Sequence, residues 1–270
     1  MAATGILRRG HLANAAAVAL VALALAGCAS KREVTTGSVE RGYGGKPVEQ
    51  LTSAEMNSEM EALGRAYTRD TKNKAVAMRY ASVLQLNGRA DQALAVMRKA
   101  AIDFPKERDV LAAYGKSLAA AGELEPALEA VRRAQTPEYP DWKLVSAEAA
   151  ILDQLGRTQD ARNLYRKAIE MRPNEPSVVS NLGMSFVLEG DLKQAETYMR
   201  QASQMPGADS RVRQNLALVV GLQGRFKEAE DIARQELSPQ QAQANVDYLR
   251  SMLSQQNAWK QLAREEKNTN

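Results

Sequence analysis

The sequence predicts an all-α fold, a solenoid of about five 34-residue helix–turn–helix repeats with a capping helix at each end. Glycine recurs at a constant interval of 34 residues, at Gly88, Gly122, Gly156, Gly190 and Gly224. Alanine keeps the same interval at Ala93, Ala127, Ala161, Ala195 and Ala229. Two more registers of small residues accompany them: Ala81, Gly115, Ala149, Gly183 and Ala217, and Ala100, Ala134, Ala168 and Ala202, the last broken by Glu236. Four registers with one mismatch indicate a repeated unit.

A period of 34 residues is typical of the tetratricopeptide repeat (TPR), in which each unit is a pair of helices. We place the repeats at about 74–107, 108–141, 142–175, 176–209 and 210–243, within a solenoid that spans 51–270. No single unit can cover its own apolar face, so neighbouring units stack. Such stacks usually present binding surfaces, and binding is therefore the kind of function that the period favours.

The fourth unit shows how the sequence builds each pair. Its first helix has an apolar stripe at i, i+3, i+4 and i+7, namely Val179, Leu182, Gly183 and Phe186. Gly190 supplies the left-handed backbone that ends this helix, and Asp191 is a suitable N-cap for the next one. The second helix turns inward with Ala195, Met199 and Ala202. The small residues allow close approach of the two helix axes, and the large ones fill the remaining space.

Both ends of the solenoid have the pattern of a capping helix. Thr52 and Glu55 have the spacing of a capping box, and an apolar stripe follows, which predicts a helix over 52–69. At the other end, Val246, Leu249 and Leu253 form a stripe that should cover the fifth repeat. We expect the polar tail beyond Glu265 to be frayed.

Residues 1–27 have the pattern of a secretory signal. Arg8 and Arg9 precede an apolar run from Leu12 to Ala26, and small residues follow. As a helix this run would span about 22 Å, short of the roughly 30 Å hydrocarbon core of a bilayer. The ending Leu25-Ala26-Gly27-Cys28 resembles the bacterial lipobox, and Cys28 is the only cysteine. An ordinary signal peptide with a coincidental cysteine is the alternative.

The resemblance to the lipobox implies that Cys28 is lipidated and becomes the first residue of the mature chain. Several acyl chains would then hold the protein firmly on a membrane. Ala29 and Ser30 follow, and by analogy with Gram-negative lipoproteins the absence of Asp there favours the outer membrane. Residues 28–50 are then a lipidated cysteine and a flexible, glycine-containing tether of about 25 Å. This implies an outer-membrane protein on the periplasmic face.

Composition argues against most enzyme chemistry. The only histidine, His11, lies within the signal, so the mature chain has neither imidazole nor free thiol. We therefore expect no catalytic residues, no metal site, no cofactor and no enzyme activity. Without residues 1–27 the chain keeps 34 basic and 32 acidic side chains of the original 36 and 32. These charges are interspersed, and we expect no nucleic-acid binding.

The candidate binding site is the concave groove, which the first helices of a TPR array line. We expect outward side chains there to contact a peptide or protein, and among these positions we also place Met78 and Asp153. The candidate contact residues lie in repeats three to five: Lys143, Ser146, Ser180, Asn181, Met184, Arg211, Gln214, Asn215 and Leu218. For the two asparagines, hydrogen bonding within the array remains an equal alternative.

The C-terminal third resembles the TadD family in the stretches RQNLALVVGLQGRFKEAEDIA, residues 213–233, and NVDYLRSML, residues 245–253. TadD proteins are TPR lipoproteins of tight-adherence (Tad/Flp) pilus assembly. The resemblance implies a pilotin-like, non-enzymatic scaffold at the outer membrane. Its protein partner would be the pilus secretin or another Tad component.

Two other functions remain open from the sequence. A TPR lipoprotein can instead assist outer-membrane protein insertion or polysaccharide export, and neighbouring genes would discriminate these from pilus assembly. An enzyme or an enzyme regulator acting on the cell wall is the third hypothesis, which the missing histidine and thiol disfavour.

Overall fold

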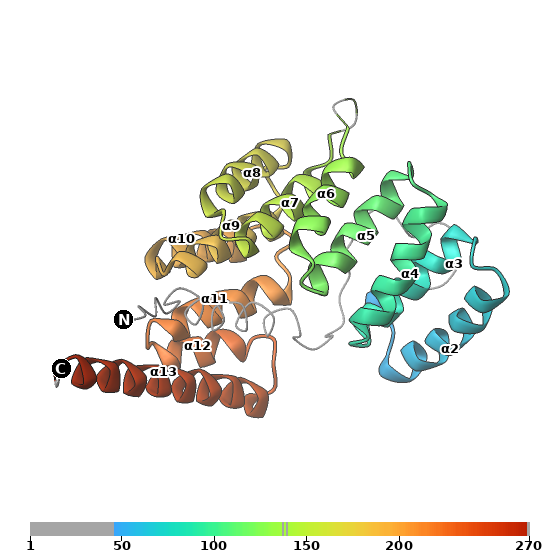
Figure 1. The fold of residues 1–270 in the computed structure, drawn as a ribbon. Coiled ribbons are helices and arrows are strands. Elements are labelled where there is room, and N and C mark those ends of the chain that lie inside the picture. The colour runs from blue at the N-terminus through green and yellow to red at the C-terminus, as the bar shows by residue number, and fades with distance from the viewer. Residues whose placement is uncertain (1–45, 137, 139, 269–270) are drawn as a thin grey trace, which may run out of the picture.

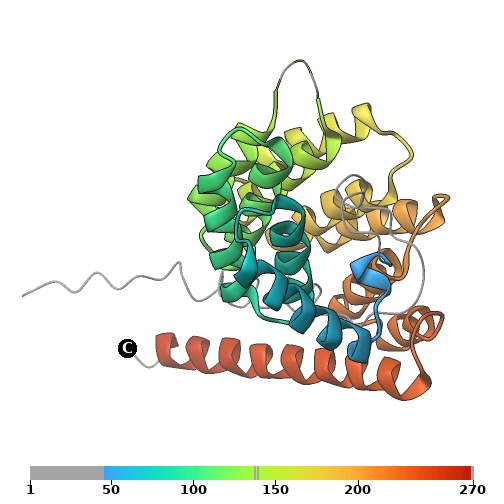
Figure 2. The ribbon, with the colours of Figure 1, turned by 90° about the vertical axis from the view of Figure 1, so that its right-hand side faces the viewer.

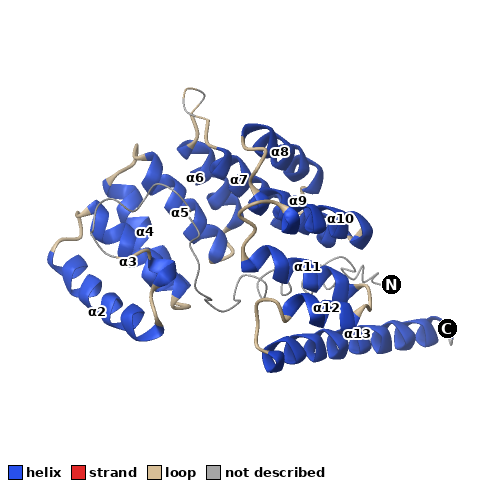
Figure 3. Cartoon of the chain, turned by 180° about the vertical axis from the view of Figure 1, so that it is seen from behind, coloured by secondary structure: helices blue, strands red, loops and turns tan. Residues whose placement is uncertain are grey.

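The computed structural model describes residues 46–136, 138 and 140–268. Over these residues the chain forms twelve α-helices, and consecutive helices pack in pairs around a curved array (Figure 1). Figure 3 draws helices and connecting loops throughout the same part of the chain. The predicted all-α fold class is confirmed. The signal, Cys28 and most of the expected tether lie outside the described residues.

A short 3-10 helix, η1 (Val48–Gln50), and α2 (Ser53–Arg69) precede the repeated pairs. The pairs are α3 (Lys74–Leu86) with α4 (Ala90–Asp103), α5 (Arg108–Ala120) with α6 (Leu124–Ala134), α7 (Trp142–Gln154) with α8 (Thr158–Met171), α9 (Pro176–Glu189) with α10 (Leu192–Gln204), and α11 (Ser210–Leu222) with α12 (Phe226–Ala233). The long α13 (Pro239–Asn268) ends the array. The five first helices therefore begin 34 residues apart. No helix of the described residues is long and apolar enough to cross a membrane.

Side-chain caps fix the start of several helices. Thr52 accepts a hydrogen bond from the backbone of Glu55, whose carboxylate accepts from Thr52 in return, as the capping box predicts. The side chains of Asn73 and Asp209 cap α3 and α11 by accepting a hydrogen bond from the backbone of Val76 and of Val212. Asp191 caps α10, as its place after a turn glycine predicts.

The five periodic glycines end the first helix of each pair. Each has a positive φ, between 74° and 87°, which a residue with a Cβ adopts only with strain. The amide after the glycine donates back to a carbonyl of the helix, for example from Asp191 to Phe186 at 3.0 Å. This Schellman-type bond satisfies a carbonyl that would otherwise lack a partner at the helix end.

Small residues bring the two helices of a pair into close contact. The five periodic alanines from Ala93 to Ala229 are at most 1% exposed. A Cβ on Gly115 would lie 2.6 Å from Cγ2 of Val131, so only glycine allows the observed approach of α5 and α6.

The packed part of the chain begins earlier than the predicted tether allows. Val48 and Leu51 are 5% and 8% exposed, and they form a cluster with Leu63 and Val76. Their burial covers apolar surface at the start of the first repeat, so residues 46–50 are part of the folded cap and not of a flexible coil.

The fifth repeat ends differently from the others. Its second helix, α12, stops at Ala233, and Glu236 lies beyond it. The carboxylate of Glu236 accepts a hydrogen bond from Nε of Arg213. In the fourth repeat the equivalent residues are Val179 and Ala202, which pack together. An Arg–Glu pair thus replaces an apolar pair, which explains why Glu236 breaks the alanine register.

The C-terminal cap is longer than the sequence indicates. Helix α13 continues to Asn268, although the polar sequence beyond Glu265 predicts a frayed tail. At 1.5 Å per residue its 30 residues span about 45 Å. In Figures 1 and 2 it runs past the short α12, against which its first turns pack.

Candidate functional site: the inner face of the first helices

The first helices lie on the inner side of the curve. Each first helix from α3 to α9 contacts the next first helix, and these contacts are more extensive than those between successive second helices. In a curved stack the elements on the concave side are the closer ones. The first helices therefore present the inner surface of the array.

Burial identifies the open side of each first helix. The second, ninth and thirteenth residues of each first helix lie at the centre of this open side, within about 40° of one another around the helix axis. We call these positions the inner face. They are Ala75, Asp109, Lys143, Ser177 and Arg211 in the second place, Ser82, Lys116, Ala150, Met184 and Leu218 in the ninth, and Leu86, Ala120, Gln154, Leu188 and Leu222 in the thirteenth.

Four of the predicted contact residues lie on this inner face. Lys143 and Arg211 sit near the first turns of α7 and α11; the Lys143 ammonium lies 5.5 Å from the ring centroid of Trp142. A guanidinium nitrogen of Arg211 is 3.6 Å from a carboxylate oxygen of Asp209. Met184 and Leu218 are half-buried, and Met184 packs against the core of the fifth repeat.

Four of the other five residues form a polar seam between first helices, and the fifth, Gln214, bonds within its own helix. The Asn181 amide donates to the hydroxyl of Ser146 at 3.3 Å, and the Asn215 amide donates to that of Ser180 at 3.2 Å. Gln214 donates to Ser210 on its own helix at 2.9 Å. Ser146, Ser180 and Asn215 are at most 9% exposed. Both asparagines thus join a first helix to the preceding first helix, and the recurrence of Ser and Asn 35 residues apart is the sequence signal for this contact.

Two further residues that the sequence placed outward are also buried. Met78 is 4% exposed and packs in the core of the first repeat, and Asp153 is 7% exposed. Both lie at the edge of the exposed arc of their helices, where neighbouring helices cover them.

Asp153 belongs to a buried polar network between repeats three and four, which sequence reasoning missed. Its carboxylate accepts a hydrogen bond from the Ser185 hydroxyl at 2.9 Å. Arg162, 4% exposed, donates to the same serine and forms an ion pair with Glu189 at 2.6 Å. Its guanidinium also lies 4.0 Å from the ring centroid of Phe186.

Burial controls the ionisation of this network. It raises the pKa of Asp153 from 3.8 to about 6, although hydrogen bonds from Ser185 and Tyr165 and the charge of Arg162 act in the opposite direction. Burial, together with the adjacent Asp153 carboxylate, also raises the pKa of the Tyr165 hydroxyl well above 10. The network joins α7, α8 and α9 and therefore holds the third repeat to the fourth.

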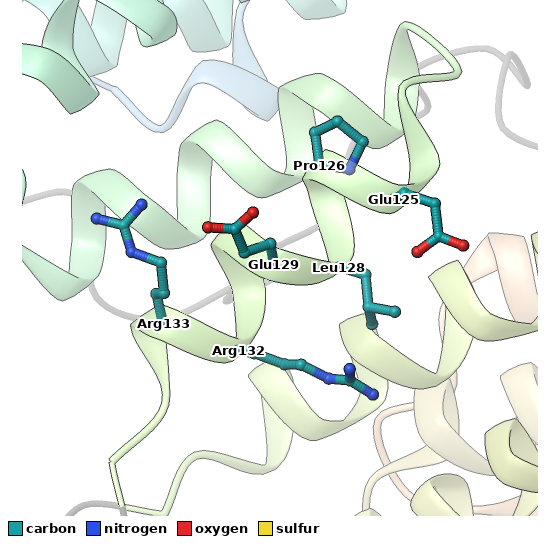
Figure 4. A pocket seen from close by; sticks show the side chains of 6 residues that line it. All are labelled: Glu125, Pro126, Leu128, Glu129, Arg132 and Arg133. Atoms are coloured by element: carbon teal, nitrogen blue, oxygen red, sulfur yellow. The ribbon is translucent and has the colours of Figure 1, made fainter.

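A shallow depression opens along α6 (Figure 4). Its lining comes from this helix alone: Glu125, Pro126, Leu128, Glu129, Arg132 and Arg133. Arg132 pairs with Glu148 at 2.7 Å, and Arg133 donates to the carbonyl of Pro105 at 3.2 Å. Arg132 thus joins α6 to α7 and Arg133 joins α6 to the turn before α5, and we assign no binding site here. Within the part of the chain that is described, no cluster of side chains is suited to hold a metal ion.

The stacked pairs and their open inner side define a helical-repeat binding scaffold. Residues 81–141 and 146–209 match the family model of the tetratricopeptide repeat. The 34-residue helix pairs of the structure extend the same layout from Lys74 to α12. The protein is a TPR array, a scaffold for protein–protein interaction.

Solved TPR proteins share this fold. A tetratricopeptide repeat protein from Parabacteroides merdae is 12% identical, with a TM-score of 0.65 over 73% of this chain and 78% of that one. A thermophilic TPR protein of Thermus thermophilus is 20% identical, with a TM-score of 0.58 over 65% and 98%. At these identities the two likenesses concern the fold alone. PilF of Pseudomonas aeruginosa also matches, at 20% identity and a TM-score of 0.49 over 68% and 82%, and no conclusion is drawn from it. Among curated proteins the comparison found no match.

Proposed function

We propose that this chain is a non-enzymatic, pilotin-like scaffold that binds a protein component during assembly of a Tad/Flp pilus machinery. It is anchored through lipidated Cys28 at the periplasmic face of the outer membrane. Its partner is the pilus secretin or another Tad component, and the inner face receives it.

The observation that carries the proposal is the coincidence of two features in the C-terminal repeats. The TadD-like stretches, residues 213–233 and 245–253, cover α11, α12 and the middle of α13. The same elements carry Arg211 and Leu218, where side chains of the inner face remain open to a partner. The lipobox-like Leu25-Ala26-Gly27-Cys28 gives independent support for the location.

Deletion of the gene in its own bacterium tests the pilus role. We expect surface pili to disappear while pilin remains detectable in whole-cell immunoblots, because a scaffold acts in assembly and not in pilin synthesis. Expression of the full chain from a plasmid should restore the pili. Normal pilus numbers in the deletion strain would contradict the proposed role.

Two substitutions test the anchor. Cys28→Ala should release the protein into the periplasm, because the thiol is the attachment point for the acyl chains. Ala29→Asp should keep the anchor but shift the protein towards the inner membrane. Membrane fractionation followed by a carbonate wash measures both. Retention of the Cys28→Ala chain on membranes would refute the lipid anchor.

Co-purification tests the partner. The tagged chain, solubilised from outer membranes in detergent, should retain the secretin, and a Leu218→Ser chain should retain less of it. Recovery of equal amounts of secretin with the intact and the substituted chain would exclude the inner face as the contact surface.

A further inference from the structure

Helix α13 occupies the position of the first helix of a sixth repeat. Its buried residues Ala242, Val246 and Leu249 have the same spacing as Val212, Leu216 and Val219 of α11. It contacts both α11 and α12, as a first helix contacts the preceding pair. A methyl group on Gly221 would come within 2.9 Å of Cδ1 of Leu249, which shows how closely the helices approach. The inner face defined above therefore continues onto α13.

The side of α13 that would hold a second helix is polar. In α9 the positions that receive the second helix are Val179, Gly183 and Phe186, whereas α13 has Gln243, Asp247 and Arg250 in the same places, all exposed. Arg250 lies 5.0 Å from the ring centroid of Phe226 and interacts with Asp247 at 3.4 Å. This polar side needs no partner, as expected of a terminal cap.

The same register places Tyr248 in the ninth position and Met252 in the thirteenth position of the inner face. Tyr248 is 55% exposed, unusually open for a large aromatic side chain. An apolar stripe thus runs across three successive inner helices: Met184, Leu188, Leu218, Leu222, Tyr248 and Met252. In the first three repeats the equivalent positions hold a mixture of polar and apolar residues, such as Ser82, Lys116 and Ala150.

The charges along the inner face are predominantly positive. At its second, ninth and thirteenth positions in the five described first helices, the ionisable residues are Asp109, Lys116, Lys143 and Arg211. The one acid, Asp109, is 3.1 Å from the ammonium of Lys74. Lys143 and Arg211 lie near the first turns of their helices, where the helix dipole adds to the positive potential. A partner with acidic side chains along this edge is electrostatically complementary.

We propose that the apolar stripe receives an amphipathic α-helix of a protein partner, with acidic side chains along the edge that faces Lys143 and Arg211. This rests on the proposed function, because it specifies the partner that the scaffold takes. The axes of packed helices are about 8–10 Å apart. Equivalent stripe residues on neighbouring first helices, such as Met184 and Leu218, are therefore spaced at about that interval. Residues i, i+7 and i+14 of a crossing helix are about 10.5 Å apart and meet this spacing. An extended strand repeats the same face at about 6.6 Å and does not.

A synthetic peptide tests this geometry. The protein is the full chain with the substitution Cys28→Ala, which removes the proposed lipid anchor, so no detergent is needed. The probe is a fluorescent helical peptide of about 18 residues, with Leu at i, i+4, i+7, i+11 and i+14 and Glu along one flank. The first control peptide has the same composition with its Leu residues at alternate positions. The second replaces Glu by Lys. Fluorescence anisotropy should show saturable binding of the first peptide and at least tenfold weaker binding of both controls.

Matched protein variants locate the binding surface. Tyr248→Ser and Leu218→Ser should each weaken peptide binding about tenfold, because each removes an apolar contact from the stripe. Ala150→Ser changes the same ninth position on α7, outside the stripe, and should leave the affinity within twofold. Far-UV circular dichroism of all three variants checks that the fold is retained.

Several results would overturn the proposal. These are equal binding of the alternate-leucine peptide, unchanged affinity of the Tyr248→Ser chain, and stronger binding of the Lys peptide. A concentration-dependent dimer that Tyr248→Ser abolishes in analytical ultracentrifugation would assign the stripe to a second copy of the chain. Pilus counts in the deletion strain test the proposed function separately, so a failure of the helix-binding inference can be told apart from a failure of the proposed function.

Discussion

Replacement of Asp153 by Asn should stabilise the protein at neutral pH but not in acid. Asp153 is buried between the third and fourth repeats, and its folded-state pKa of about 6 lies above the ordinary value of 3.8. The fold therefore favours the neutral carboxyl. Its contribution to stability is fully present below pH 4 and is lost as the pH rises through about 6. Asparagine keeps an oxygen for the Ser185 hydroxyl and never ionises.

The magnitude follows from the shift in the pKa of Asp153. A difference of about two pH units, at 1.36 kcal/mol each, corresponds to about 3 kcal/mol. The free energy of unfolding of the Asp153→Asn chain, minus that of the natural chain, should therefore rise by about 3 kcal/mol between pH 4 and pH 8. Taking this difference at each pH cancels the titration of the other carboxylates.

Urea denaturation followed by far-UV circular dichroism measures both chains at a series of pH values. Asp160→Asn is the matched control, because Asp160 is exposed and forms a surface ion pair with Arg157. Its difference from the natural chain should vary by less than about 0.5 kcal/mol over the same range. A flat difference for Asp153→Asn would show that the buried carboxyl keeps an ordinary pKa and would refute the reasoning.

Four further substitutions test the helix ends, the contact between α5 and α6, and the fifth repeat. Gly190→Ala should cost about 1 kcal/mol from its φ of 87° alone, because the added Cβ meets no packed neighbour within 4 Å. Gly115→Ala should cost about 1–3 kcal/mol through overpacking against Val131, and thermal unfolding measures both. Thr52→Ala should cost about 1 kcal/mol through loss of the N-cap of α2, and Thr52→Ser should recover it. Glu236→Ala should cost about 1–2 kcal/mol by leaving Arg213 without its carboxylate. Arg213→Val combined with Glu236→Ala copies the fourth repeat and should recover most of that loss, and equal instability of the single and double variants would contradict this account.

Sequence periodicity predicted the elements that recur in every repeat. A glycine at 34-residue intervals needs a positive φ wherever it occurs, and all five have one. An alanine such as Ala161 permits close helix contact in each copy, and it is fully buried. These features depend on short-range geometry that each unit repeats, so five copies of the pattern reinforce one interpretation.

Features present in a single copy escaped the same reasoning. Asp153, Arg162 and Ser185 lie on three helices, and their contact depends on how the third repeat meets the fourth. A buried carboxylate and an exposed one are the same letter in the sequence, and only the neighbouring helix distinguishes them. The polar seam could be predicted in part. The sequence identifies Ser146 and Asn181 as residues of the first helices, but it does not show that they are hydrogen-bonded to each other.

The C-terminal helix shows how the limits of periodicity bear on function. Repeat five is shortened at Ala233, so α13 starts too early for a sixth unit at the 34-residue interval. Its stripe of Ala242, Val246 and Leu249 nevertheless has the internal spacing of a first helix. A search for spacing within helices, in addition to spacing between repeats, would have found this equivalence. Because α13 packs as a first helix, Tyr248 lies on the inner face. The cap that closes the core therefore also lengthens the surface available to a partner.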